Sequence, residues 1–315
     1  MMLLLACVST PEGLDAAALD AAVTLGAQVD DAALMATVEG LVEARAQDEG
    51  EYLEFKEFTL YHAEARRWCT DTLTAMGFEV VTETTTEDGV EVNNLLVDIP
   101  GASRPEELVL LTAHYDAVGP GADDNGSALA ALFEAARLLQ QDPPARTVRL
   151  VLTDWEEVYT LGARRYYRDH QSDDVVAVVN LDAVGVASSA PGSQRAPTGL
   201  VLPDTADFLG VIGDADAEQD AFIANQIAEA MTPPLPLLTL LGPGDLDNAA
   251  SLHLHRSDHS VAWAYGLPAL FLTDTADFRS DTYHTPDDLP ETLNPDFLAQ
   301  SARLTAALAY ARAEL

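Results

Sequence analysis

Two periods of hydrophobic residues alternate along this chain. Short apolar runs, typical of buried strands, are followed by segments in which apolar residues recur every three or four positions, typical of helices. The predicted strands are 78–85, 90–99, 108–111, 148–153, 175–179, 208–212 and 269–273, and the predicted helices lie within 8–50, 51–76, 127–142, 217–230 and 295–313. This order predicts an α/β fold: a three-layer αβα sandwich around a mostly parallel, mixed sheet.

Turn residues set the boundaries between these segments. Gly77 is expected to end a helix, Asp88-Gly89 to form a hairpin turn, and Ser127 to cap the amino end of the next helix. A Ser/Pro/Gly-rich stretch at 186–207 is expected to be a loop. The Pro/Gly-interrupted stretch 232–248 is expected to line a pocket as a loop rather than to join the sheet.

Length and amino-terminal composition suggest one domain preceded by a leader. The 315 residues are enough for a single α/β core, which we place at 30–315, with 1–29 as leader and linker. Residues 4–7, Leu-Leu-Ala-Cys, resemble a bacterial lipoprotein processing site at which Cys7 would be lipidated. The preceding residues lack a basic region and a full apolar run. The match is therefore either a truncated signal, which implies an extracytoplasmic protein anchored by lipid, or chance.

The charge of the chain excludes some partners. It has 52 acidic residues against 16 Lys and Arg, a formal net charge of -36. Nucleic acids and anionic membrane surfaces are therefore poor partners, and a lipid at Cys7 would be the only link to a membrane. The acidity is consistent with adaptation to salt or with a bias in composition, and a stability that does not change with salt would exclude the first. The sequence does not indicate an oligomeric state.

Potential metal ligands follow the predicted strands. These residues are His114, Asp116 and Asp123 after 108–111, Glu156 and Glu157 after 148–153, and Asp182 after 175–179. The carboxyl ends of parallel strands meet at one edge of a sheet, where α/β proteins bind their ligands. Each residue by itself could equally be a solvated turn residue or a helix cap.

Five motifs in a fixed order favour the metal site. They are AHYDAVGPGADDNGSA at 113–128, the Glu-Glu pair followed by Leu161-Gly162, NLDAVG at 180–185, SDHSVAWAYGLPALFL at 257–272 and YHTPDD at 283–288. With them the chain resembles, from about residue 30 to its end, the two-zinc aminopeptidases of metallopeptidase family 28, which also include glutamate carboxypeptidases and glutaminyl cyclases. The resemblance implies a zinc exopeptidase with the phosphorylase/hydrolase-like fold of that family.

The resemblance also implies a role for each residue. One zinc is expected on His114 and Asp182, the other on Glu157 and His284, with Asp123 as the bridging ligand. Asp116 is expected to hold the second ring nitrogen of His114. Glu156 is the expected general base, and Tyr283 is expected to stabilise the oxyanion.

The chemistry of the expected site is peptide hydrolysis. Two zinc ions can share a water and lower its pKa, so that Glu156 takes its proton during attack on the scissile carbonyl. Departures from the family at Trp155 and Tyr159 add bulk near the base and are expected to narrow the choice of substrate side chain. Asp258-His259 is expected to be structural, and His253 and His255 to pack or lie on the surface.

The most favoured function is therefore an aminopeptidase that acts on peptides. A carboxypeptidase would need a cation for the substrate carboxylate, for which Arg195, Arg256 and Arg279 are candidates. Two alternatives remain: an acyltransferase similar to glutaminyl cyclases, with a single zinc, and a non-catalytic binding module on the same fold.

Overall fold

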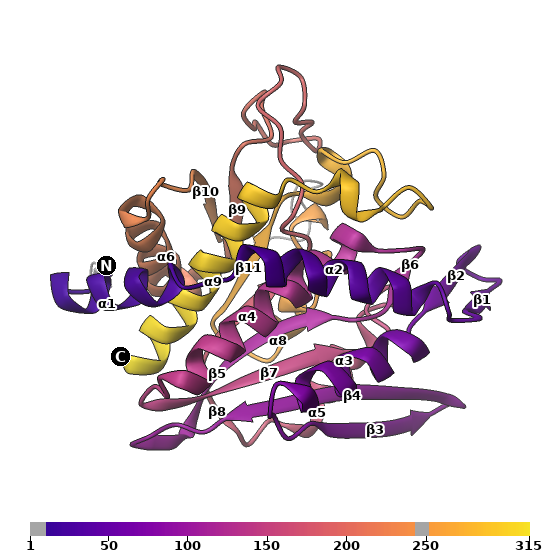
Figure 1. Ribbon diagram of the computed structural model, residues 1–315, viewed down its shortest axis with the longest axis horizontal. Helices are drawn as coiled ribbons and strands as arrows, with labels where there is room; N and C mark the ends of the chain where they lie inside the picture. Colours follow the sequence, from indigo (N-terminus) through magenta and orange to yellow (C-terminus); the bar gives the residue numbers. More distant parts are fainter. Residues whose placement is uncertain (1–10, 243–251) are drawn as a thin grey trace, which may run out of the picture.

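The structure, a computed structural model, describes residues 11–242 and 252–315 and has an eight-stranded mixed sheet at its centre (Figure 1). Cys7 lies outside the described residues. The sheet order is β10-β9-β11-β8-β5-β7-β4-β3, in which β11, β8, β5 and β7 run parallel. The strands are β3 (Val81–Glu87), β4 (Val90–Ile99), β5 (Arg104–His114), β7 (Arg146–Thr153), β8 (Asp174–Leu181), β9 (Leu209–Gly213), β10 (Leu237–Leu241) and β11 (Ala269–Thr273).

Helices cover both faces of this sheet, as predicted. The major helices are α1 (Ala16–Gly26), α2 (Asp31–Arg45), α3 (Ala63–Ala75), α4 (Ala128–Gln141), α5 (Leu161–Asp169), α6 (Glu218–Ala230), α8 (His259–Ala264) and α9 (Pro295–Glu314). Short turns are η1 (Ala122–Ser127), η2 (Ala215–Ala217), η3 (Ala276–Phe278) and η4 (Pro290–Thr292). α4 and α9 pack on β5 from one side, whereas α5 and α8 pack on the other (Figure 1).

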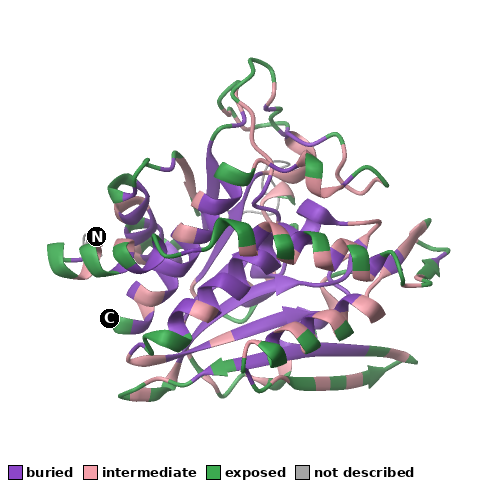
Figure 2. Cartoon of the chain, viewed as in Figure 1, coloured by how far each residue is buried: buried purple, intermediate pink, exposed green. Residues whose placement is uncertain are grey.

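Alternation along β5 explains the two layers. Val109, Leu111 and Ala113 are buried in the larger apolar cluster with α4 and α9, whereas Leu108 and Leu110 are buried with α5 and α8. Successive side chains of a strand point to opposite faces, so a strand with apolar residues at every position needs cover on both sides. Figure 2 shows the resulting buried central strands and the exposed outer edge of β3.

The structure differs from the expected leader. Residues 16–26 form α1, whose Ala22 and Leu25 are buried in the main cluster, against α9 and α6. Asp15 caps this helix by accepting the N–H of Ala18 at 2.8 Å. This part of the predicted leader therefore belongs to the same core as the sheet.

Two further segments differ from the sequence prediction. Residues 51–61, expected to be helical, form a hairpin of β1 (Glu51–Leu53) and β2 (Phe58–Tyr61), and β2 also pairs with β6 (Ala117–Val118). Contacts distant in sequence decide this, because Leu53 and Leu60 pack with Trp155. The stretch 232–248, expected to be a loop, contains β10, an edge strand parallel to β9. Pro233, Pro234 and Pro236 precede the strand, where they remove no ladder hydrogen bond. Residues 243–248 of the stretch lie outside the described residues.

Within residues 11–242 and 252–315, no helix combines the length and the apolar character that crossing a bilayer requires.

A buried arginine ties α2 to the loop after β5. Arg45 is 1% exposed and donates to the backbone oxygens of Tyr115 at 2.7 Å, Pro120 at 3.0 Å and Gly121 at 2.6 Å. Loop carbonyls buried in this way need a donor, since an unsatisfied one is costly. Arg45 therefore sets the path of the chain that leads from His114 to η1.

We expect Arg45→Met to lower the free energy of unfolding by about 3 kcal/mol or more, because two buried carbonyls and one partly buried carbonyl lose their donor at about 1–3 kcal/mol each. Urea unfolding in the presence of a chelator measures this without a contribution from bound metal. Arg67→Met is the matched control, because Arg67 is exposed and its ion pair is with the neighbouring Glu64; it should cost less than about 1 kcal/mol. Equal costs for the two variants would contradict the role of Arg45.

Candidate metal centre

Four parallel strands bring the predicted site residues to one edge of the sheet. β5 ends at His114, β8 ends one residue before Asp182, and β7 ends three residues before Glu156. Tyr283 and His284 lie in the segment that follows β11. The site is thus assembled at the carboxyl ends of these strands, where an α/β sheet commonly binds its ligand.

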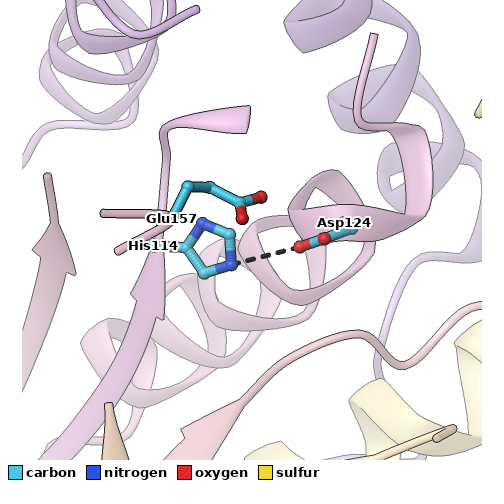
Figure 3. Close-up of side chains that lie close together, drawn as sticks. All are labelled: His114, Asp124 and Glu157. Atoms are coloured by element: carbon cyan, nitrogen blue, oxygen red, sulfur yellow. Dashed lines mark ion pairs between the residues drawn. The ribbon is translucent and has the colours of Figure 1, made fainter. Parts of the chain in front are cut away.

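Two histidines face one shared carboxylate. His114 Nε2 lies 3.2 Å from Asp124 Oδ1, and His284 Nε2 lies 3.0 Å from Asp124 Oδ2. Glu157 Oε1 is 3.0 Å from His284 Nε2, and Asp182 Oδ2 is 3.7 Å from His114 Nε2. Figure 3 shows His114, Asp124 and Glu157 converging from three different segments of the chain.

The carboxylate between the histidines belongs to Asp124, whereas we expected Asp123. Asp124 has an extended backbone, with φ -103° and ψ 91°, which turns its side chain away from the direction taken by its neighbour. Asp123 Oδ1 instead accepts the backbone N–H of Gly185 at 2.9 Å. Two adjacent residues of the same type cannot be told apart from their spacing, so no signal in the sequence identified Asp124.

Asp288 is a second residue that the sequence analysis missed. Its carboxylate accepts the backbone N–H groups of Asp123 at 3.0 Å and Asp124 at 3.2 Å. It is 1% exposed and lies in the YHTPDD motif, four residues after His284. Asp288 therefore links the turn that carries Asp124 to the segment that carries the second histidine.

Asp116 supports the site in a different way from the one expected. His114 Nδ1 lies 3.0 Å from the backbone oxygen of Asp116, whereas the carboxylate is 3.5 Å away. That carboxylate accepts the backbone N–H groups of Glu156 at 3.1 Å and Glu157 at 3.2 Å. Asp116 thus positions the turn of the glutamate pair as well as the histidine. Ser127 lies at the N-cap of α4 as predicted, but its hydroxyl makes no capping hydrogen bond and donates to the backbone oxygen of Asp123.

Glu156 lies in a second group of possible ligands with His114 and Asp182. Burial raises the pKa of Glu156 well above its usual range; His114 opposes this shift, and Asp182 adds to it. Burial also raises the pKa of Glu157, to about 7, and the nearby Asp124 adds to that shift. Carboxylates so close together in a buried place favour a bound cation.

Buried atoms without hydrogen-bond partners test whether a metal fits. Among the described residues, such atoms include His114 Nε2, Asp124 Oδ1, Glu157 Oε1 and His284 Nε2. His114 Nε2 lies 3.2 Å from Asp124 Oδ1, and His284 Nε2 lies 3.0 Å from Glu157 Oε1, but neither pair forms a hydrogen bond. An unpaired buried polar atom is costly, and bound metal would satisfy these atoms. Imidazole nitrogen with carboxylate oxygen is a donor set that suits zinc.

Tyr283 lies between these residues and a pocket. Its ring stacks on that of His284 at 3.8 Å between centroids, and its hydroxyl oxygen is 3.4 Å from Nη2 of Arg256. Tyr283 and Asp182 both line a pocket at this edge of the sheet. The rest of its wall is largely apolar: Leu200, Leu202, Phe208, Ile212, Leu238, Leu240, Phe271 and Phe278.

The remaining predicted residues have structural contacts. His259 is buried, stacks on Phe271 at 4.2 Å, and its Nε2 lies 2.8 Å from the backbone oxygen of Leu254; burial lowers its pKa to about 3. Asp258 accepts the hydroxyl of Thr153. Trp155 and Tyr159, expected to narrow the pocket, do not line it. Trp155 packs edge-on against His62, and Tyr159 is 62% exposed.

The sequence has relatives among known proteins. The profile of peptidase family M28 matches residues 94–234. The uncharacterized protein YfbL of Escherichia coli is 30% identical over 249 residues, which are 71% of this chain and 72% of YfbL. Leucine aminopeptidase 1 of Coccidioides posadasii is 29% identical over 236 residues, which are 69% of this chain. The chain spans only about half, 55%, of that fungal protein.

Solved structures share the fold at low sequence identity. The LapA aminopeptidase of Legionella pneumophila is similar over 98% of this chain and 75% of its own, with a TM-score of 0.70 and 17% identity. A glutaminyl cyclase of Bacteroides thetaiotaomicron matches 90% of this chain and 98% of its own, with a TM-score of 0.63 and 16% identity. A zinc aminopeptidase of Bacillus subtilis matches 72% of this chain and 52% of its own, with a TM-score of 0.55 and 22% identity.

These comparisons agree with the motifs and with the arrangement of the site. The alignment with YfbL covers more than two thirds of both sequences. The family profile covers the segments that contain His114, Asp124, Glu157 and Asp182. The solved structures reproduce the sheet and its helices. The chain is a member of peptidase family M28, a family of metallopeptidases.

Proposed function

We propose that this protein is an aminopeptidase that uses two zinc ions to remove large apolar residues from the amino ends of peptides. The observation that carries the proposal is the pair of histidines on either side of Asp124, next to an apolar pocket. Membership of the family supports a zinc-dependent exopeptidase, the two histidines support two metal ions, and the apolar pocket supports the substrate class.

The donor atoms divide into two sets that share Asp124. One set is His114, Asp124 and Asp182, and the other is Glu157, His284 and Asp124. Each set would hold one ion, and a carboxylate with one oxygen toward each histidine suits a bridging ligand. When bound, zinc supplies a Lewis acid that lowers the pKa of a water to about 7.

Glu156 and Tyr283 are positioned for the chemical steps. Glu156 belongs to the group of His114 and Asp182, so its carboxylate can take a proton from the attacking water and pass it to the leaving amine. Tyr283 and Asp182 line the same pocket. From this position the Tyr283 hydroxyl can donate to the carbonyl oxygen of the substrate as negative charge develops on that oxygen.

The arginines favour substrates with a free amino end. Arg279 is 8% exposed and donates to Gln194 and to the backbone oxygens of Val186 and Phe208. Arg195 binds Asp281, and Arg256 binds Asp277 at 2.7 Å. These three candidates for a substrate carboxylate are thus engaged with the protein itself. The carboxylates near the site can instead hold a substrate ammonium group.

Asp124→Asn is expected to leave fewer than two zinc ions per chain, because both histidines lose the carboxylate between them. Asp123→Asn is the matched control and should retain the wild-type content, since an amide oxygen can still accept the N–H of Gly185. Metal analysis after dialysis measures both. The reverse pattern would make Asp123 the shared ligand, and a single zinc in the wild type would favour cyclase chemistry.

Glu156→Gln is expected to keep the metal content of the wild type but to lower kcat by about 10²–10⁴-fold, the usual contribution of a general base. The glutamine preserves the size of the side chain but cannot take the proton. Turnover of leucine p-nitroanilide, together with metal analysis of the same sample, tests this. Full activity with two metals bound would refute the role of Glu156.

The pocket predicts a preference for leucine and phenylalanine substrates over glycine and aspartate substrates of at least about tenfold in kcat/KM, because burying such a side chain contributes about 1.5–3 kcal/mol. Leu200→Ser should reduce this preference. The adjacent Val201→Ser is the control, since Val201 is 97% exposed and does not line the pocket. A panel of aminoacyl p-nitroanilides measures both variants, and equal rates across the panel would contradict an apolar subsite.

A further inference from the structure

An arginine in the wall of the pocket, Arg256, contacts Tyr283. Arg256 Nη2 lies 3.4 Å from the Tyr283 hydroxyl oxygen, and its guanidinium carbon lies 5.8 Å from the ring centroid. Its other nitrogen, Nη1, is held by Asp277 at 2.7 Å. One side of the guanidinium is therefore fixed by a carboxylate, and the other side points to the phenol.

The direction of this hydrogen bond follows from the chemistry of the two groups. An arginine side chain has five N–H donors and no acceptor, whereas a tyrosine hydroxyl can donate and accept. The Tyr283 oxygen must therefore be the acceptor from Arg256, and its own proton must point to another acceptor. The ring is held in place by its stacking on His284, so the hydroxyl torsion is the main freedom that remains.

We propose that Arg256 is a positioning residue that turns the Tyr283 proton toward the substrate carbonyl oxygen. The inference rests on the proposed function, in which Tyr283 donates to that oxygen. The distance of 3.4 Å is long for a hydrogen bond, but such contacts often tighten only when the substrate is bound. Asp277 serves the same purpose indirectly, because it holds the guanidinium.

A purely structural role for Arg256 is the alternative, and a second arginine provides its control. Arg195 ties the same segment by donating to Asp281 and to the backbone oxygen of Asp277, but neither of these contacts involves Tyr283. If Arg256 only anchors the segment, loss of either arginine should have a similar effect. If Arg256 acts through the phenol, only its own loss should depend on Tyr283.

The experiment combines Arg256→Met and Arg195→Met with Tyr283→Phe, each checked for metal content and melting temperature. In the wild-type background, Arg256→Met is expected to lower kcat for leucine p-nitroanilide about tenfold, the scale of one hydrogen bond, with KM changed by less than about twofold. In the Tyr283→Phe background the same substitution should cost less than about twofold. Arg256→Lys, which keeps a donor, should recover part of the loss, and Arg195→Met should change kcat little in either background.

Binding provides a readout that does not need turnover. Calorimetry should show about tenfold weaker binding of leucine phosphonic acid, a tetrahedral analogue, to Arg256→Met, with the affinity for leucine unchanged. This difference should disappear in the Tyr283→Phe background. A wild type that cleaves no aminoacyl substrate would refute the proposed function, and the phosphonate affinities would still decide the role of Arg256. Equal losses in both backgrounds, or an equal loss in Arg195→Met, would overturn the inference.

Discussion

Carboxylates that lie close together in a buried place repel one another unless a cation offsets their charge, and the site depends on this constraint. Asp124, Glu157 and Asp182 approach His114 and His284 to within 3.0–3.7 Å, and among the described residues His114 Nε2, Asp124 Oδ1, Glu157 Oε1 and His284 Nε2 have no hydrogen-bond partner. Such an arrangement is unfavourable for the protein alone and favourable around metal ions. At this edge of the sheet the folded chain therefore holds carboxylates in mutual repulsion, and bound metal would relieve that repulsion.

The rigidity of the site comes from side chains that bind backbone groups of neighbouring loops. Asp116 accepts the N–H groups of the glutamate pair, and Asp288 accepts those of the two aspartates. Arg45 binds three carbonyls of the chain between His114 and η1. Each of these bonds joins segments that are distant in sequence, so the ligands are held by the closed tertiary structure and not by their own loops. This arrangement keeps ligand atoms in place when repulsion would separate them.

Chemistry and substrate selection are built from different parts of the chain. Most of the expected ligands lie at the end of β5 or in the segments that follow β5, β7 and β8. The apolar wall comes largely from β9, β10, β11 and the segments around them. Tyr283 belongs to both, since it stacks on His284 and lines the pocket. The segment between β11 and His284 is fixed by three arginines of this acidic chain. Arg195 binds Asp281, Arg256 binds Asp277, and Arg279, which lies in the segment, binds the backbone oxygen of Phe208.

The sequence by itself determined the α/β order, the strands at 90–99 and 269–273, the family, and the stretches in which the ligands lie, because periodicity and short motifs are local properties of the chain. Only the tertiary structure decided that Asp124 and not Asp123 faces the histidines, that Leu237–Leu241 joins the sheet, and that α1 belongs to the core. The reason is physical. The direction of one side chain in an Asp-Asp pair depends on hydrogen bonds to Gly185 and Asp288, and strand pairing depends on a partner far along the chain. The spacing of residues in the sequence specifies neither these hydrogen bonds nor the strand partner.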